Sequence, residues 1–224
     1  MTAPLMSLEA VSKDFAAPGG TLRVLHEVTL GVTAGESVAV MGPSGSGKST
    51  LLGLMAGLER PSAGRLLFRG RELQGLSEDS LARWRRVSVG FVFQGHRLVA
   101  DLTALENVLL PLELAGVPAP EARDRADEAL AALGLADRAG HFPRQLSGGE
   151  QQRAAIARAY VHRPELILAD EPTGSLDQET ADAVLDSFLG LNSARGTALV
   201  LVTHDPDVAA RLGRRVSLAR GRLA

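Results

Sequence analysis

Four short apolar runs stand out along the chain, and each ends at or directly before a glycine or a polar residue. They are "SVAVMG" at 37 to 42, "VSVGFVF" at 87 to 93, "ELILAD" at 165 to 170 and "TALVLVT" at 197 to 203. Nearly continuous apolar runs of this length are typical of strands buried on both faces, so they predict a parallel sheet covered by helices. Gln94, Glu171 and His204 directly follow three of these runs, at the strand ends where open α/β sheets bind ligands.

Between the runs, apolar residues recur with helical spacing. One stripe lies within residues 121–133 and another within 178–191, and Gly134 after the first stripe predicts a helix end. The interval from Gln94 to the helix starting near Ser147 contains no convincing buried strand. Its helix-like segments are predicted to break at four prolines, Pro111, Pro118, Pro120 and Pro143. We interpret this interval as a helical subdomain inserted into an α/β core.

The remaining pattern completes the predicted fold class. Residues 1–35 and 64–75 read as short strands with turns, which indicates a small antiparallel sheet. We therefore predict a single α/β domain over residues 1–224, with a mostly parallel sheet, an antiparallel β subdomain and the inserted helices. The core would take residues 1–94 and 161–224, and the helical subdomain residues 95–160.

The composition narrows the class of protein. With 224 residues, of which 45% are apolar, the chain can bury a sizeable core. Its net charge of -2 gives no support for a nucleic-acid groove, and the absence of cysteine excludes disulfides and thiolate chemistry. The start "MTAPLMSLEA" lacks the features of a secretory signal, and no run approaches the roughly 20 apolar residues of a membrane span. We expect a soluble, cytoplasmic protein that reaches a membrane only through a partner.

The stretch "GPSGSGKS" at 42 to 49 fits the pattern G-x-x-x-x-G-K-[ST] between a predicted strand and a predicted helix. The loop comprises Gly42, Pro43, Ser44, Gly45, Ser46 and Gly47. Its glycines let backbone N–H groups face phosphates, Lys48 can reach the β- and γ-phosphates, and Ser49 can ligate magnesium. A glycine-rich turn before a helix is the plainer alternative, but the flanking context favours a nucleotide site.

The stretch "ILADE" at 167 to 171 places two acids at the end of a buried strand. Adjacent residues on an extended strand point to opposite sides, so Asp170 and Glu171 cannot do the same job. We predict that Asp170 holds magnesium and that Glu171 orients or deprotonates water. Such a pair is more often a solvated strand end or a helix cap, and it is the phosphate loop that favours catalysis here.

A second glycine-rich helix start occurs at "SGGE", residues 147 to 150. Ser147 and Glu150 have the spacing of a capping box, so these residues could simply satisfy the first N–H groups of a helix. Gly148 and Gly149 favour another interpretation, because a cap gains nothing from their flexibility whereas close approach to an anion does. The local pattern leaves both interpretations open.

Six elements together resemble those of ATP-binding-cassette (ABC) ATPases in order and spacing. They are "GPSGSGKS", a lone Gln94 after a strand, "LSGGEQQR", "LILADE", "SLD" at 175 to 177 and His204 after "LVT". The resemblance covers essentially the whole chain and implies a P-loop NTPase core. "FVFQ", "LTALENVLLPLEL" and "LADEPTGSLD" look most like the ATPase subunits of lipoprotein-release and macrolide-export type permeases.

The resemblance offers an answer to the second helix start. In this family two cassettes pair head to tail, and each ATP lies between the phosphate loop of one subunit and the signature "LSGGE" of the other. The second start would therefore serve the partner's nucleotide, and a homodimer would hold two ATP through an isologous contact.

The resemblance also implies roles for single residues. The loop from Gly42 to Gly47 and Lys48 would bind phosphates, while Ser49, Thr50, Gln94 and Asp170 would surround magnesium and phosphate. Glu171 resembles the catalytic base and His204 the switch histidine at the γ-phosphate. Ser147, Gly148 and Gly149 would complete the opposite site, and Asp177 would lie across the dimer seam. Phe15 falls where relatives place an aromatic against adenine, although a lone Phe is commonly a core residue. Ser175 departs from the Asn of many relatives.

The expected function is that of an ATP-binding and ATP-hydrolysing subunit that drives such a permease from the inner face of the cell membrane. An ATP-dependent regulatory adaptor, similar to the cell-division transporter-like group, is the alternative. Cassettes that act on nucleic acid interrupt the core with long coiled coils or zinc modules, and the short interval from Gln94 to Leu146 has no room for these. We further expect Leu98, Val99 and Leu102 to form a groove for a short cytoplasmic helix of the permease.

Overall fold

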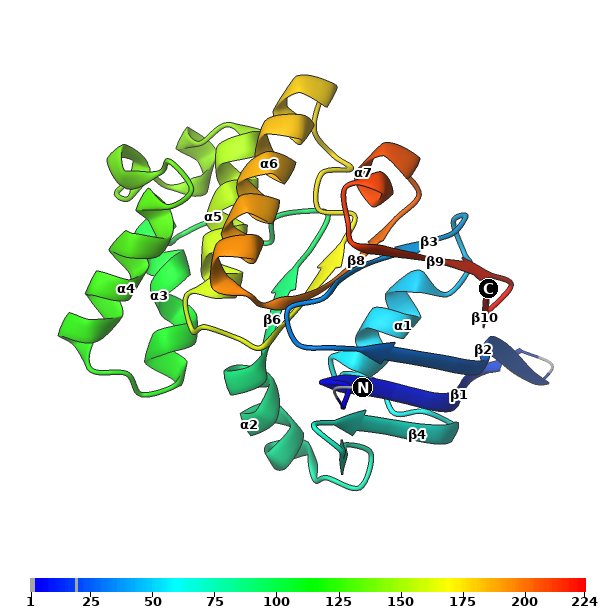
Figure 1. Ribbon diagram of the computed structural model, residues 1–224. Coiled ribbons are helices and arrows are strands. Elements are labelled where there is room, and N and C mark those ends of the chain that lie inside the picture. The colour runs from blue at the N-terminus through cyan, green and yellow to red at the C-terminus, as the bar shows by residue number, and fades with distance from the viewer. Residues whose placement is uncertain (1–2, 19) are drawn as a thin grey trace. The chain divides into compact units, whose positions relative to one another are not determined.

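The computed structural model describes residues 3–18 and 20–224 (Figure 1). The chain forms two compact units. The first contains the residues up to Arg85 together with Ala198–Ala224, and the second is Arg86–Thr197.

An antiparallel sheet makes up one part of the first unit. It contains β1 (Met6–Ala17), β2 (Gly20–Val32), β4 (Ala63–Phe68) and β5 (Arg71–Glu72), in the order β2-β1-β4-β5. Along β1, Met6, Leu8 and Val11 are buried, as are Leu66 and Phe68 of β4. This alternation gives the sheet one apolar face. The predicted antiparallel sheet is confirmed, with its first two strands longer than expected.

Parallel strands make up the other part of the first unit. The strand β3 (Ser37–Met41) lies between β8 (Ala198–Thr203) and β9 (Arg214–Ala219) and is parallel to both, and β10 (Arg222–Leu223) runs antiparallel to β9. Every residue of β8 is buried, which is why its sequence shows no alternation. The helix α1 (Lys48–Met55) follows β3, and the short α7 (Pro206–Ala210) follows β8.

The helix α2 (Glu78–Ser88) carries Trp84, and contacts with the antiparallel sheet and with Gly57 orient this helix. The Trp84 ring meets Phe68 edge to face, with ring centroids 5.2 Å apart, and Arg85 donates a hydrogen bond of 2.7 Å to the carbonyl of Gly57. Trp84 therefore points toward the antiparallel sheet, while Arg83 and Arg86 are exposed.

The second unit contains two parallel strands and four α-helices. The strands are β6 (Val89–Val92) and β7 (Leu166–Asp170). The helices are α3 (Ala104–Leu114), α4 (Ala119–Ala131), α5 (Gly148–Tyr160) and α6 (Gln178–Arg195), with 3₁₀ turns at Ala136–Arg138 and Pro143–Gln145. The helix α5 contacts all three other helices and β6 (Figure 1). Its many alanines, such as Ala154 and Ala155, are buried and allow these close contacts.

One sequence expectation is wrong within this unit. Pro111 lies inside α3 and does not break it. A proline removes one backbone hydrogen bond from a helix. The capping box at Thr103 and the buried residues Val108 and Leu112 offset this loss. Pro118 and Pro143, by contrast, lie at the starts of helical segments, where a proline is tolerated.

The second unit is larger than the predicted helical subdomain, since it also includes β6, β7 and α6. The division of the chain at residues 95 and 160 stays a prediction. Within residues 3–18 and 20–224, no helix combines the length and the apolar character needed to cross a bilayer.

Candidate functional site

The loop between β3 and α1 needs glycine at two positions for steric reasons. A Cβ on Gly42 would lie 2.2 Å from the carbonyl oxygen of Leu218 and 2.6 Å from Ser46 Oγ. A Cβ on Gly47 would lie 2.8 Å from a methyl carbon of Leu25, and Gly47 has a left-handed φ of 103°. The loop can therefore keep this path only without side chains at residues 42 and 47.

Lys48 is the first residue of α1, and its side chain folds back over the loop. Its Nζ donates hydrogen bonds of 2.7 Å to the Gly42 carbonyl and 3.1 Å to the Pro43 carbonyl. Ser46 Oγ is buried and has no hydrogen-bond partner within the described part of the chain. Ser49 is exposed and Thr50 half-buried on the first turn of α1.

The start of α1 lacks the usual internal caps. Gly47 supplies no side-chain acceptor, and among the described residues the first turn holds no acidic side chain. The first N–H groups of a helix need acceptors, and they carry the positive end of the helix dipole. An uncapped start beside a lysine is therefore suited to bind an anion such as phosphate.

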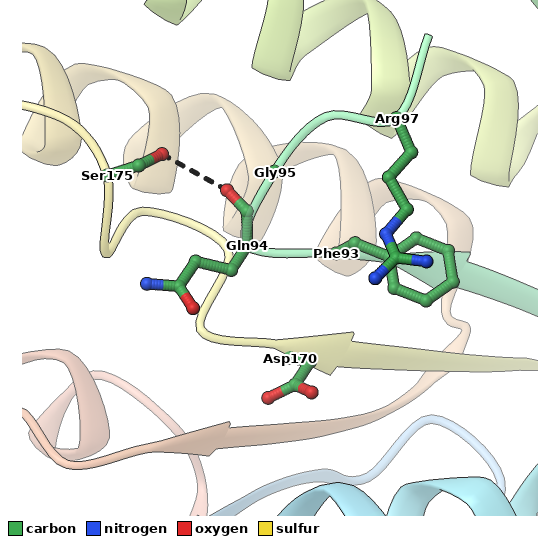
Figure 2. Close-up of a pocket in the computed structure, with 6 residues that line it drawn as sticks. All are labelled: Phe93, Gln94, Gly95, Arg97, Asp170 and Ser175. Carbon is green, nitrogen blue, oxygen red and sulfur yellow. Dashed lines mark hydrogen bonds between the residues drawn. The ribbon is translucent and has the colours of Figure 1, made fainter.

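In the second unit, Gln94 and Asp170 line one cavity of about 420 Å³. Phe93, Gly95, Arg97 and Ser175 complete its lining (Figure 2). Ser175 Oγ donates a hydrogen bond of 3.1 Å to the Gln94 carbonyl. Although Ser175 stands where many relatives have Asn, it therefore still links its loop to the Gln94 segment. Figure 2 shows the Gln94 amide and the Asp170 carboxylate extending toward the same open region. Both side chains offer oxygen atoms, which are the ligands that magnesium prefers.

Glu171 directly follows β7 and has an uncommon backbone conformation. Its φ is 46°, in the left-handed region that non-glycine residues seldom adopt. Its carbonyl accepts a hydrogen bond of 3.0 Å from the Gly174 amide. Strained residues of this kind are concentrated at active sites. The turn also separates Glu171 from Asp170, consistent with different roles for the two acids.

The capping-box interpretation of Ser147 is confirmed in the structure. Its Oγ accepts a hydrogen bond of 3.2 Å from the Glu150 amide, and its own amide donates one of 2.8 Å to Glu150 Oε2. This amide hydrogen bond is the main reason that the pKa of Glu150 lies below its usual value, and Arg138, 3.0 Å away, lowers it further. Close approach of an anion to this helix start stays a prediction.

The two glycines of the signature have different environments. Gly149 is buried, and a Cβ on it would lie 2.5 Å from Thr180 Cγ2. Packing against α6 therefore explains Gly149, a reason that the sequence pattern did not indicate. Gly148 is exposed, and a Cβ there would meet only a Leu176 side-chain carbon, at 3.2 Å.

Three further candidates lie at element ends or edges. Asp177 is exposed and caps α6 by accepting a hydrogen bond of 3.0 Å from the Thr180 amide, and this bond lowers the pKa of its carboxyl. His204 is exposed one residue beyond β8. Phe15 is half-buried in β1, with Lys13 Nζ 4.7 Å from its ring centroid. The structure thus describes every predicted residue.

Sequence reasoning missed three polar residues that organise this region. Gln152 and Arg158 of α5 donate hydrogen bonds to the backbone of the Gln94 segment, and the fully buried Asn107 bonds the loop ahead of α3. A possible sequence signal was a polar residue among alanines in "QQRAAIARAY", but a partner about sixty residues away in sequence leaves no local pattern.

An uncapped phosphate loop in one unit and an oxygen-lined strand end in the other are features of P-loop nucleotide-binding proteins. Comparison with known proteins specifies the class. The sequence profile described as "ABC transporter" matches residues 25–174. The chain therefore belongs to the ABC transporter family, and it is an ATP-binding and ATP-hydrolysing cassette.

Individual relatives agree with this assignment. The lipoprotein-releasing system ATP-binding protein LolD of Idiomarina loihiensis is 46% identical over 99% of this chain and 97% of its own length. The macrolide export ATP-binding/permease protein MacB 1/2 of Paracoccus denitrificans is 50% identical over 99% of this chain, which spans 33% of that longer protein. The dimeric, post-hydrolysis structure of the ATP-binding cassette MJ0796 with ADP and Pi superposes with a TM-score of 0.88 at 40% identity, covering 97% of this chain and 96% of that one.

Proposed function

We propose that two copies of this chain close around two ATP and magnesium to drive a membrane permease of the lipoprotein-release or macrolide-export type. The identity of 46% to LolD and of 50% to MacB, in each case over 99% of this chain, supports this type of transporter. The proposal places the protein at the inner face of the cell membrane, held there by its permease. The observation that carries it is the helix start at Lys48, which has no internal cap among the described residues.

The proposed nucleotide contacts follow from the groups that each segment offers. The amides from Gly42 to Gly47 and the Lys48 ammonium would bind the phosphates. Ser49, Gln94 and Asp170 would hold magnesium, which neutralises charge on the phosphates when it is bound. Phe15 would stack on adenine through the ring face that Lys13 does not cover.

Two residues would act on the reacting groups. Glu171 would accept a proton from the attacking water, which requires its carboxylate to be ionised. His204 would donate a hydrogen bond to the γ-phosphate, and its exposed place one residue beyond β8 supports this role.

The partner subunit would complete each site. Ser147, Gly148 and Asp177 are exposed, so they are available to a second copy. The solved structures of the ATP-binding cassette MJ0796, which are 40% and 41% identical to this chain, are dimeric, and this supports the pairing of two copies. Gly149 would contribute its amide and would keep the helix start close to α6.

Glu171→Gln tests the proposed function. The amide retains the shape of the side chain but cannot take a proton, so we expect ATP hydrolysis to slow at least about a hundredfold with ATP affinity unchanged. Steady-state hydrolysis and binding of a fluorescent ATP analogue measure the two quantities. Near-normal turnover would show that Glu171 is not the group that accepts the proton from water.

The permease would dock beside the loop ahead of α3. Asn107 fixes that loop by accepting a hydrogen bond from the Val99 amide and donating to the carbonyls of Val99, Leu102 and Thr103, at distances of 2.7 to 3.1 Å. The backbone is therefore held while the Val99 side chain stays 44% exposed, and Leu98 and Leu102 are half-buried. An apolar patch on a rigid loop is suited to receive a short helix.

Leu98→Glu combined with Leu102→Glu tests this docking surface. We expect ATP binding to persist and co-purification with the permease to be lost, because two carboxylates would be buried at the contact. Glu113→Leu on the exposed part of α3 is the control for a charge change. A folded double variant that still co-purifies would place the docking surface elsewhere.

A further inference from the structure

The backbone from Phe93 to Arg97 is held by side chains of α5, the helix that begins at the signature. Gln152 is buried, with 2% of its surface exposed, and its Nε2 donates a hydrogen bond of 3.0 Å to the Phe93 carbonyl. The two terminal nitrogens of Arg158 donate to the carbonyls of His96, at 3.0 Å, and Arg97, at 2.8 Å. One helix therefore holds this segment at both ends.

The Arg158 contact stabilises an unfavourable backbone conformation. Arg97 has a φ of 48°, which is sterically costly for a residue with a side chain. This conformation turns the Arg97 side chain back over Phe93, with the guanidinium carbon 4.4 Å from the ring centroid. Such a turn persists only where the surroundings fix it, and here Arg158 holds the carbonyls on both sides of the Arg97 α-carbon.

The fixed turn determines where Gln94 lies. Gln94 is the residue after Phe93, within the anchored segment, and its own carbonyl accepts the hydrogen bond from Ser175. With both ends and the middle held, its side chain extends into the cavity that it shares with Asp170 (Figure 2). Loss of the Arg158 end would leave Gln94 free to take other directions.

We propose that Arg158 is a positioning residue for ATP hydrolysis, which fixes Gln94 toward Asp170 by bonding the carbonyls of His96 and Arg97. The inference rests on the proposed function for the role of Gln94. The guanidinium suits this task because its planar fork directs two N–H groups at once, whereas a lysine ammonium lacks that fixed geometry. The same bonds make the Gln94 segment follow any displacement of α5.

The test compares Arg158→Gln and Arg158→Lys with the wild-type protein. The matched control is Arg123→Gln, which removes a guanidinium from an exposed ion pair with Asp127 on α4. Hydrogen exchange of the peptide spanning residues 93–99 is measured without nucleotide, and kcat and KM are measured with ATP and magnesium. For Arg158→Gln we expect exchange about tenfold faster and kcat reduced about 10- to 100-fold, with KM within about twofold, because misplaced groups chiefly affect the reacting geometry. Arg158→Lys should fall between, and Arg123→Gln should match the wild type.

Two results would overturn the inference. One is wild-type exchange or wild-type kcat in a folded Arg158→Gln protein. The other is faster exchange throughout the chain with loss of ATP binding, which would make Arg158 a general structural residue. If the wild-type protein itself hydrolyses no ATP, the proposed function fails, and the exchange of residues 93–99 still decides whether Arg158 holds the segment.

Discussion

The two glycine-rich helix starts of this chain are built in different ways. At the phosphate loop, Gly47 is the N-cap of α1 and provides no side-chain cap, and Lys48 is the first residue of the helix. At the signature, Ser147 is the N-cap of α5 and forms a complete capping box with Glu150, an acid in the first turn of the helix. The first start leaves its N–H groups for an external anion, while the second already satisfies part of its own.

Under the proposed function, this difference lets one chain carry two phosphate-facing loops with different roles. An uncapped start with a lysine can bind a nucleotide within its own subunit. A capped start keeps its shape without a ligand, as is needed for a surface that waits for a partner. Ser147 and Gly148 are exposed at the second start, whereas Lys48 is only 9% exposed at the first. Substitutions at either helix start test this difference.

The largest effect is expected from Ser147→Arg in the Glu171→Gln background. Glu171→Gln alone should form dimers with ATP and magnesium, and the added arginine should abolish them, since a large side chain blocks close approach to the partner's phosphate. Light scattering after size exclusion gives the oligomeric state. Thr103→Arg is the control, because it destroys the equivalent capping box of α3. If dimers persist in the Ser147→Arg protein, the signature does not contact the partner's phosphate and serves only to cap α5.

A smaller effect is expected from Lys48→Ala at the first start. It removes a cation from the phosphate loop, so ATP affinity should fall at least about tenfold, in line with the loss of a charge-assisted hydrogen bond. Isothermal titration with ATP measures it. Unchanged affinity would mean that the ammonium, which bonds the Gly42 and Pro43 carbonyls, only supports the loop.

The fold was predictable where burial alone decides it. The strands β3, β7 and β8 are buried on both faces, so their sequences are almost continuously apolar. The helix break that the sequence predicts at Pro111 does not occur, because the cost of this proline within α3 is offset by packing that no local pattern shows. The approach of Gly149 to an anion stays a prediction, and its packing against Thr180, about thirty residues further along the chain, is a second reason for a glycine that no local pattern shows.

The candidate site was predictable as residues but not as an arrangement. Lys48, Asp170 and Ser147 stand in motifs whose spacing identifies them. The contacts that hold Gln94, from Ser175, Gln152 and Arg158, come from distant segments and depend on the tertiary structure. A single sequence carries no record of such pairs.

The smallest effect concerns the stability of the second start. Ser147→Ala should reduce the free energy of unfolding by about 1 kcal/mol, the usual worth of a cap. Because the pKa of Glu150 is lowered in the folded protein, its contribution is present above the unfolded pKa and is lost as the pH falls through the folded pKa. Glu150→Gln should therefore lose less stability than the wild type between pH 7 and pH values below about 4, where an ordinary glutamate is protonated. Urea midpoints at both pH values measure the difference.

Glu106→Gln provides the comparison for that measurement. Glu106 completes the same kind of capping box at α3, and the Thr103 amide lowers its pKa. Arg138 adds an ion pair only to Glu150 of these two acids. If Glu150→Gln changes the pH dependence less than Glu106→Gln does, the ion pair contributes nothing measurable.

A mixture of two inactive variants tests the central claim most directly. Lys48→Ala lacks a working phosphate loop, and Ser147→Arg lacks a working signature. If each ATP uses the loop of one subunit and the signature of the other, a mixed dimer contains one intact site. We predict that mixing the purified variants restores ATP hydrolysis well above the sum of their separate rates. A mixture no more active than that sum would contradict the account, because both helix starts would then serve a single nucleotide within one chain.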